Sequence, residues 1–233
     1  SLNCAILGPD ARPGTEEYDL FVKEVGREMT SKAGQKCTAI RRTIVPDSMM
    51  DDVIGGLKGR LAGVKTGDPS GEGVKMGPLA GKPQVKEVGT SLDALKGGAD
   101  VIYSGDGVEP VGAQAGRGAF FPITLLSTND PHSRLQPHQV EAFGPVNTVM
   151  PYSSVWYAIH LARLGRGSLC GSLFTNDDSV ARDVVLGAAP WHGRLYLLNR
   201  SAAKESTGHG SPLPDLVHGG PGRARGGEGM GGV

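Results

Sequence analysis

Apolar side chains recur along this chain in two alternating patterns. From Glu16 to about Lys32 they stand three and four residues apart, which places them on one face of a helix. Short apolar runs typical of strands flank that segment, at Leu2–Leu7 and Thr43–Val45. The two patterns keep alternating as far as residue 198. This order predicts an α/β fold of three layers, in which a mostly parallel sheet is flanked by helices.

The remaining elements follow from the same patterns. Further helices are expected at 48–61, 84–96, 153–164 and 179–186, and further strands at 100–104, 119–126, 146–150, 169–174 and 194–198. We expect Ser48 to cap its helix, Pro122 to make its strand an edge or irregular one, and the Gly- and Pro-rich stretch 64–83 to be an ordered connection. The charged helix faces are expected to be solvated. Sites in parallel sheets lie beyond the carboxyl ends of the strands, so we expect the site at that edge.

Composition excludes several classes of protein. The 233 residues carry 24 basic and 24 acidic side chains, and this zero net charge argues against a nucleic-acid or anionic-membrane partner. Hydrophobic residues make up 38%, which suffices for one core, so residues 1–233 are expected to form one domain. No apolar run reaches the ~18 residues of a membrane span. Three widely spaced cysteines argue against a disulfide framework and for a cytoplasmic protein. Because the chain opens on Ser1 with a strand already under way, we expect it to be a fragment.

The stretch around Cys37 is the first candidate for chemistry. Cys37 stands between a predicted helix and a predicted strand, and Gly34 just before it indicates a backbone path that other residues avoid. Two interpretations compete: an inert structural thiol, as most free cysteines are, or a nucleophile presented at an element junction. Three cations surround it in sequence: Lys36, Arg41 and Arg42. They could favour the thiolate, but we expect them to be exposed charges beside the helix end.

Other conspicuous residues have simpler interpretations. His132 and His138 could be metal ligands, but no carboxylate or cysteine cluster accompanies them, so we expect exposed loop histidines and no metal. Cys170, inside an apolar run, is expected to be a core residue. Residues 227–232 match the dinucleotide fingerprint G-x-G-x-x-G only formally, because a strand and a helix do not flank them. The tail 204–233 is either flexible or a loop that packs over the active site.

Four separated segments resemble, in order, the catalytic domain of the aldehyde dehydrogenase superfamily. They are GQKC at 34–37, GDP at 67–69 with MGPL at 76–79, EAFGPV at 141–146, and the run from Gly222 and Arg223 to Glu228. Two longer segments narrow the resemblance to one group within the superfamily. They are KAGQKCTAIRRTIVP and, in the tail, KESTGHGSPLPDLVHGGPGRA. They are similar to the dehydrogenase part of bacterial phenylacetate-degradation ring-opening enzymes, which is fused to a hydratase-like domain. A similar semialdehyde dehydrogenase of aerobic benzoyl-CoA degradation lacks that fusion.

The resemblance implies a role for each motif. Cys37 would be the nucleophile that attacks an aldehyde, and Glu228 would assist the base that activates water. Glu141 would bind the nicotinamide ribose hydroxyls and Phe143 would pack beside the nicotinamide, with NADP or NAD as the cofactor. The substrate would be an aldehyde at the end of a CoA-linked chain. The whole protein would be a homo-oligomer.

The resemblance also implies parts that lie elsewhere. The family's general base, its coenzyme-binding domain and its carboxyl-terminal continuation have no counterpart in 1–233, and 204–233 would be a Gly-rich closing loop. We therefore expect the isolated chain to be inactive and the whole protein to be active. Three alternatives stay open. The first is the semialdehyde dehydrogenase of benzoyl-CoA degradation, and the second is a non-catalytic binding or oligomer-forming module of the same fold. The third is transfer of the acyl group to free CoA rather than to water.

Overall fold

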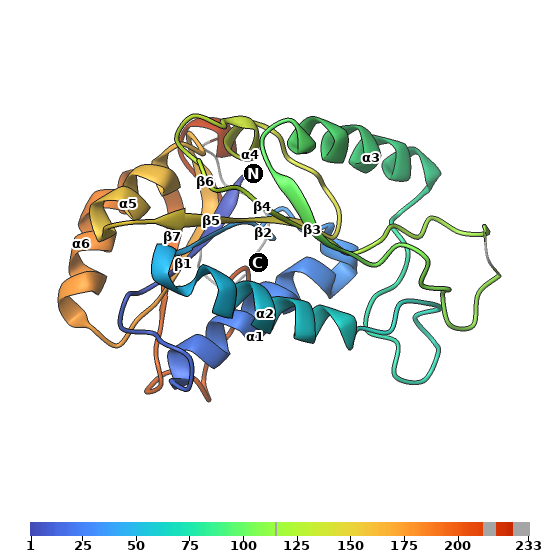
Figure 1. The fold of residues 1–233 in the computed structure, drawn as a ribbon, viewed down its shortest axis with the longest axis horizontal. Coiled ribbons are helices and arrows are strands. Elements are labelled where there is room, and N and C mark those ends of the chain that lie inside the picture. The colour runs from blue at the N-terminus through green and yellow to red at the C-terminus, as the bar shows by residue number, and fades with distance from the viewer. Residues whose placement is uncertain (115, 212–217, 226–233) are drawn as a thin grey trace.

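A seven-stranded sheet forms the middle layer of the part of the chain that the computed structural model describes, residues 1–114, 116–211 and 218–225 (Figure 1). The strands are β1 (Asn3–Leu7), β2 (Ile40–Pro46), β3 (Asp100–Ser104), β4 (Thr124–Ser127), β5 (Val146–Tyr152), β6 (Ser168–Phe174) and β7 (His192–Leu198). Their order across the sheet is β3-β4-β5-β2-β1-β6-β7, and each neighbouring pair is parallel except β3 with β4. The predicted mostly parallel α/β sheet is confirmed.

Helices cover both faces of this sheet (Figure 1). They are α1 (Glu16–Thr30), α2 (Met50–Ala62), α3 (Lys82–Lys96), α4 (Gln136–Gln139), α5 (Val155–Arg163) and α6 (Asp178–Ala188). Figure 1 shows α1 and α2 below the sheet, α3 above it, and α5 and α6 at its left end. The helices α5 and α6 pack on a second cluster of strand residues, separate from the one that α1 and α2 cover. The three predicted layers are therefore present, and α1 connects the neighbouring parallel strands β1 and β2.

The predicted elements are present with shifted ends, and two details are wrong. Ser48 does not cap α2, because residues 47–49 form a 3-10 turn and the helix begins at Met50. β4 is not an edge strand, because β3 pairs with it and covers its open side. β4 begins only after Pro122, so the amide hydrogen that proline lacks is not needed in the sheet.

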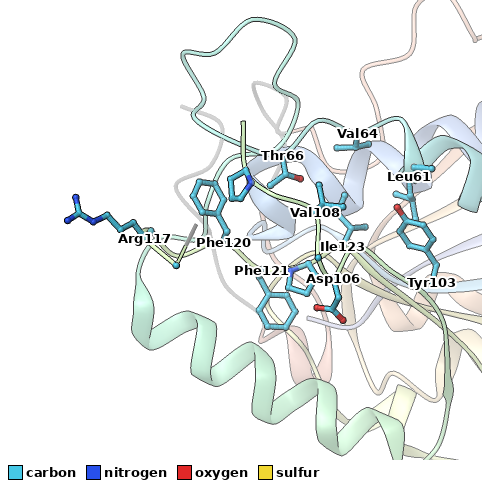
Figure 2. Close-up of a pocket in the computed structure, with 17 residues that line it drawn as sticks. Leu61, Val64, Thr66, Tyr103, Asp106, Val108, Arg117, Phe120, Phe121 and Ile123 are labelled. Carbon is cyan, nitrogen blue, oxygen red and sulfur yellow. The ribbon is translucent and has the colours of Figure 1, made fainter. Parts of the chain in front are cut away.

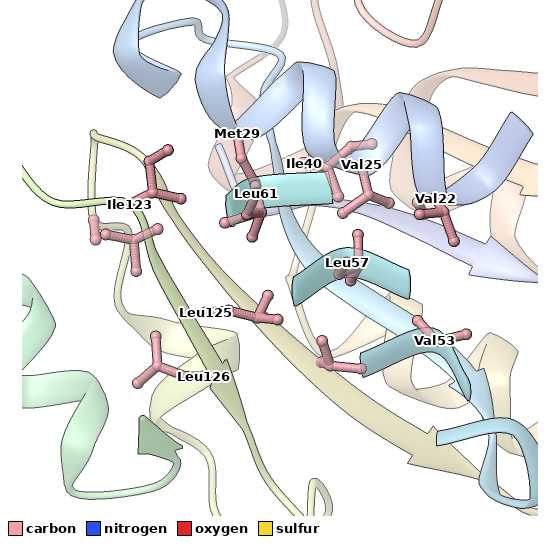
Figure 3. Packing of buried hydrophobic residues seen from close by; sticks show 14 of the residues in the cluster. Val22, Val25, Met29, Ile40, Val53, Leu57, Leu61, Ile123, Leu125 and Leu126 are labelled. Atoms are coloured by element: carbon pink, nitrogen blue, oxygen red, sulfur yellow. The ribbon is translucent and has the colours of Figure 1, made fainter. Parts of the chain in front are cut away.

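One hydrophobic core lies between the sheet and the helices α1 and α2 (Figure 3). Val25 of α1 and Leu57 of α2 are fully buried there, and they pack over Ile40 of β2 and Leu125 of β4. Truncating a buried leucine to alanine typically costs about 2–5 kcal/mol of stability. This packing fixes α1 on the sheet, and with it the turn that follows the helix.

Arg42 and His138 are buried, contrary to the predicted exposed charge and exposed loop histidine. Arg42 has no exposed surface and donates to the carbonyl oxygen of Leu2 and to carbonyls at the end of α5. The Nδ1 atom of His138 lies 3.0 Å from the Arg42 guanidinium, and its Nε2 lies 2.9 Å from the Pro131 carbonyl oxygen. Sequence periodicity cannot reveal a buried cation whose partners are backbone carbonyls. His132 is exposed, as expected.

His138 should make the fold less stable in mild acid. Burial and the nearby Arg42 lower the pKa of His138 from 6.5 to about 3. The folded state keeps this histidine neutral while the unfolded chain takes up a proton below pH 6.5. The free energy of unfolding therefore falls as the pH drops below 6.5, and this loss levels off near pH 3.

The variant His138→Gln keeps one acceptor and one donor but does not titrate. In urea unfolding it should lose about 2 kcal/mol less stability than the wild type between pH 7.5 and pH 5. The matched control is His132→Gln, which changes an exposed histidine and should keep the wild-type pH dependence. An unchanged pH dependence in His138→Gln would contradict the assignment.

Three carboxylates of α1 are buried, although the charged helix faces were expected to be solvated. Glu17, Glu24 and Glu28 are each exposed by 6% or less. Glu17 accepts hydrogen bonds from the backbone and guanidinium of Arg200, and this pairing lowers the pKa of Glu17 to about 2. Glu24 accepts a bond of 2.6 Å from the backbone nitrogen of His209. The helix therefore holds the segment after β7 along its length, with Arg200 at its first turn and His209 further toward its carboxyl end.

Candidate active site

Cys37 lies at the amino edge of the sheet. It stands in a turn between the end of α1 and the start of β2. A helix that links two parallel strands must run back across the sheet, so the turn after it returns to the edge where strands begin. The expected position at the carboxyl edge is therefore wrong. The segments before β5 and at the start of β1 reach the same edge and bring Glu141 and Asn3 there.

The turn before Cys37 has an uncommon backbone. Lys32, Ala33 and Gly34 have φ angles of 52°, 51° and 69°. A Cβ added to Gly34 would lie 2.2 Å from the carbonyl oxygen of Gly144, so only glycine lets these two segments approach each other. The unusual path predicted from Gly34 is confirmed.

Arg41 ties this turn to the segment that holds Glu141 and Phe143. Its buried guanidinium donates to the carbonyl oxygens of Gly34 and Gly144, each at 2.7 Å. Its Nε atom lies 3.7 Å from a carboxylate oxygen of Glu141, and its guanidinium carbon lies 5.3 Å from the centre of the Phe143 ring. The exposed charge expected here is in fact a buried cation that joins two of the sequence motifs.

Asn3, which was not among the predicted site residues, binds the turn through its side chain. Its side-chain amide donates to the carbonyl oxygens of Cys37 at 2.9 Å and Ala39 at 3.0 Å. Its side-chain oxygen accepts from the backbone nitrogen of Cys170 at 3.0 Å. The available signal was an asparagine inside an apolar strand, because such a buried amide must find partners.

Cys37 is exposed, whereas Cys4 and Cys170 are buried. The Cys37 Sγ atom lies 3.3 Å from Nε2 of His218, a residue that gave no signal within its Gly- and Pro-rich surroundings. Burial raises the pKa of Cys170 to about 12, which keeps it a neutral thiol in the core, as expected. Cys37 is therefore the cysteine that a substrate can reach.

A cavity of about 790 Å³ opens beside the turn. Its lining includes Lys32, Gln35, Gln84 and Phe143. Gln35 joins three segments of the wall, because its Nε2 donates to the Phe143 carbonyl at 3.3 Å and its Oε1 accepts from the Ala80 nitrogen at 2.7 Å. The Phe143 side chain is 41% exposed, so its ring is available to a bound molecule.

Glu141 lies at the same edge but does not line this cavity. One of its carboxylate oxygens contacts the Ser1 nitrogen, and the other faces Arg41 and accepts no hydrogen bond within the described residues. Glu228, the fourth predicted site residue, lies outside the described residues, as do residues 227–232. The structure thus brings Cys37 and Phe143 to an accessible surface and keeps Glu141 half-buried beside them.

A second cavity, of about 290 Å³, lies beside the start of β4 (Figure 2). Its walls are mostly apolar and include Leu61, Tyr103 and Ile123. Figure 2 shows Arg117 extending away from it. Its lining residues hold no cysteine, histidine or lysine, so the chemistry of this edge gathers around Cys37.

Two further site types are absent from residues 1–114, 116–211 and 218–225. This part of the chain contains no group of three or more His, Cys, Asp or Glu side chains placed to hold a metal ion. Over the same residues, no helix is both long and apolar enough to cross a bilayer.

Comparison with known proteins identifies the family. The sequence profile of the aldehyde dehydrogenase family matches residues 14–189. The chain belongs to this family. The 3,4-dehydroadipyl-CoA semialdehyde dehydrogenase of Aromatoleum evansii is 44% identical over 226 residues, which cover 97% of this chain and 44% of that relative. Protein MaoC of Klebsiella aerogenes is 48% identical over 159 residues, which cover 68% of this chain and 46% of that protein.

Solved aldehyde dehydrogenase structures share the fold. A variant of Staphylococcus aureus betaine aldehyde dehydrogenase, in complex with NAD+, matches with a TM-score of 0.73 at 26% identity, over 84% of this chain and 38% of its own. Aldehyde dehydrogenase C of Pseudomonas syringae matches with a TM-score of 0.78 at 23% identity, over 99% of this chain and 44% of its own, which supports the fold alone. The chain spans less than half the length of these proteins. The family resemblance and the aldehyde dehydrogenase type of fold are confirmed.

Proposed function

We propose that this chain is the nucleophile-bearing catalytic part of an NAD(P)-dependent aldehyde dehydrogenase that oxidises a CoA-linked semialdehyde to its carboxylic acid. The observation that carries the proposal is the position of Cys37. It is an exposed thiol on a strained glycine turn, where two of the family's motifs meet beside an open cavity. A cysteine with only a structural role would be expected in the core, as Cys4 and Cys170 are.

Cys37 supplies the covalent chemistry. Its thiolate adds to the carbonyl carbon of the aldehyde while the carbonyl electron pair moves to oxygen. We assign the backbone N–H of Cys37 as a donor to this oxyanion, and such donors typically contribute about 3 kcal/mol to the step. Loss of hydride from the same carbon leaves a thioester, and water cleaves it to the acid and frees the thiolate. Cysteine suits both steps because its thiolate is strongly nucleophilic and its thioester is labile.

A bound nicotinamide coenzyme would accept the hydride. The residues present fit this group in two respects. The exposed ring of Phe143 offers an apolar face at the cavity, against which a flat ring can pack. The Glu141 carboxylate has an oxygen that accepts no hydrogen bond within the described residues, so it can accept one from a ribose hydroxyl. We propose that Glu228 assists the base that activates water.

The substrate class rests on the motifs and the relatives. The Aromatoleum relative is named for a CoA-linked semialdehyde. The sequence of the tail resembles that of phenylacetate-degradation enzymes. We therefore place the whole protein in aerobic degradation of an aromatic acid in the cytoplasm, as a homo-oligomer, with a hydratase-like domain fused to it. The general base and the coenzyme domain would come from segments beyond these 233 residues, and 204–233 would close the site.

A covalent intermediate tests this proposal. When the whole protein turns over a CoA-linked semialdehyde, the acyl group should be found on Cys37. Its appearance on Cys170 instead, or on no cysteine while oxidation proceeds, would contradict the proposal.

A further inference from the structure

We propose that His218 is the proton acceptor that converts Cys37 into its thiolate, so that this chain carries a cysteine–histidine pair. The inference rests on the proposed function, in which Cys37 is the nucleophile, and it adds a residue that none of the four family motifs contains. The observation behind it is the distance of 3.3 Å between Cys37 Sγ and His218 Nε2, which is within hydrogen-bonding range for sulfur. Cys37 lies at the amino edge of the sheet, and the segment that carries His218 packs there against the starts of β6 and β7.

Three other charged or titratable groups near Cys37 are poor acceptors for its proton. Lys36 is bound to the buried carboxylate of Glu28 at 2.5 Å. Arg41 is held by backbone carbonyl oxygens, and its guanidinium does not deprotonate in proteins. Cys170 is a buried neutral thiol. The histidine is the basic group that the described residues place against the thiol.

The segment that carries His218 is anchored rather than loosely placed. The carbonyl oxygen of Gly219 packs so closely on Gly193 at the start of β7 that a Cβ there would lie 1.7 Å from it. Further along, the backbone nitrogen of Arg223 donates to the carbonyl of Arg166 at 2.8 Å. These contacts fix the backbone that follows His218 against the segments at the starts of β6 and β7.

The proton transfer balances without a co-reactant. One proton moves from Sγ to Nε2, which gives a thiolate and an imidazolium with no change in total charge. A sulfur lone pair then forms the S–C bond while the carbonyl π pair moves to oxygen. When the thioester is cleaved, the bonding pair returns to Sγ beside the imidazolium. A free cysteine is only a few per cent thiolate at neutral pH, so a paired base can raise the reactive fraction by about tenfold or more.

The test is the pH dependence of Cys37 alkylation in the whole protein. Iodoacetamide is neutral, and peptide mass analysis assigns the modified cysteine, so no turnover is needed. The variant His218→Gln keeps a polar side chain but removes the base. Its Cys37 should react about tenfold more slowly than the wild type at pH 7, and the two rates should converge above pH 10. The control His132→Gln should follow the wild-type profile.

Two results would overturn the pairing. One is an unchanged profile in His218→Gln. The other is a rate lowered by the same factor at every pH, which would show that His218 governs access rather than the proton. Failure of the proposed function is separate from both, because it would show as continued aldehyde oxidation by a Cys37→Ala protein whatever the alkylation profile of the wild type.

Discussion

Replacing Cys37 by alanine in the whole protein should lower aldehyde oxidation by at least about 10⁴-fold, because no other exposed thiol among the described residues can form the covalent adduct. The loss should appear in kcat, since substrate and coenzyme would still bind beside an intact turn. The carbonyl oxygen of residue 37, which accepts from Asn3, is unchanged by the substitution. Steady-state rates of NADPH or NADH formation measure the effect directly.

The matched control is Cys170→Ala. Cys170 has no exposed surface, and its contact with Asn3 is made by its backbone nitrogen, so loss of its side chain should leave oxidation within a few-fold of the wild type. The reverse ranking, with Cys37→Ala active and Cys170→Ala inactive, would show that Cys37 is not the nucleophile.

Replacing Gly34 by alanine should lower kcat/KM by about 10²-fold, because the site depends on how closely two segments approach. At a φ of 69° a Cβ costs about 1–2 kcal/mol by itself. That Cβ would also lie 2.2 Å from the Gly144 carbonyl oxygen, so one segment must move. A displacement of ~1 Å at a reacting group costs about 10²-fold in rate. The shift separates Cys37 from Phe143 even though neither side chain is altered.

Gly59→Ala is the control for this prediction. Gly59 lies exposed in α2 with open space around its Cα, so alanine should fit and should slightly favour the helix. Both variants are measured for oxidation and for thermal unfolding. Wild-type activity in Gly34→Ala would mean that the contact with Gly144 does not position the nucleophile.

The fold could be predicted from local patterns because each helix and strand has its own periodicity. The turn at Gly34 could also be anticipated, since glycine is the residue that accepts positive φ at low cost. The edge of the sheet that holds the site was not predicted correctly. The general rule for parallel sheets favours the carboxyl edge, but Cys37 follows a helix that returns to the amino edge.

The polar interior was the least predictable part. The sequence predicts Arg41 and Arg42 to be surface charges. Both are buried in the structure, and they donate to carbonyl oxygens of segments distant in sequence. Asn3 and His218 reach Cys37 from 34 and 181 residues away. No local pattern encodes such contacts, because they depend on which strands become neighbours. Cys37 was a candidate from its local sequence and Phe143 from a family motif, while their supporting residues required the structure.

The most direct measurement is the mass of the peptide that contains Cys37 during turnover. The whole protein is mixed with NADP or NAD and a CoA-linked semialdehyde, quenched in acid within the first turnover, and digested at low pH to preserve the thioester. The expected result is a mass increase equal to the acyl group on Cys37, absent without coenzyme and absent in Cys37→Ala. Rapid oxidation with unmodified Cys37, or an acyl group carried by another residue, would contradict the role assigned to this cysteine.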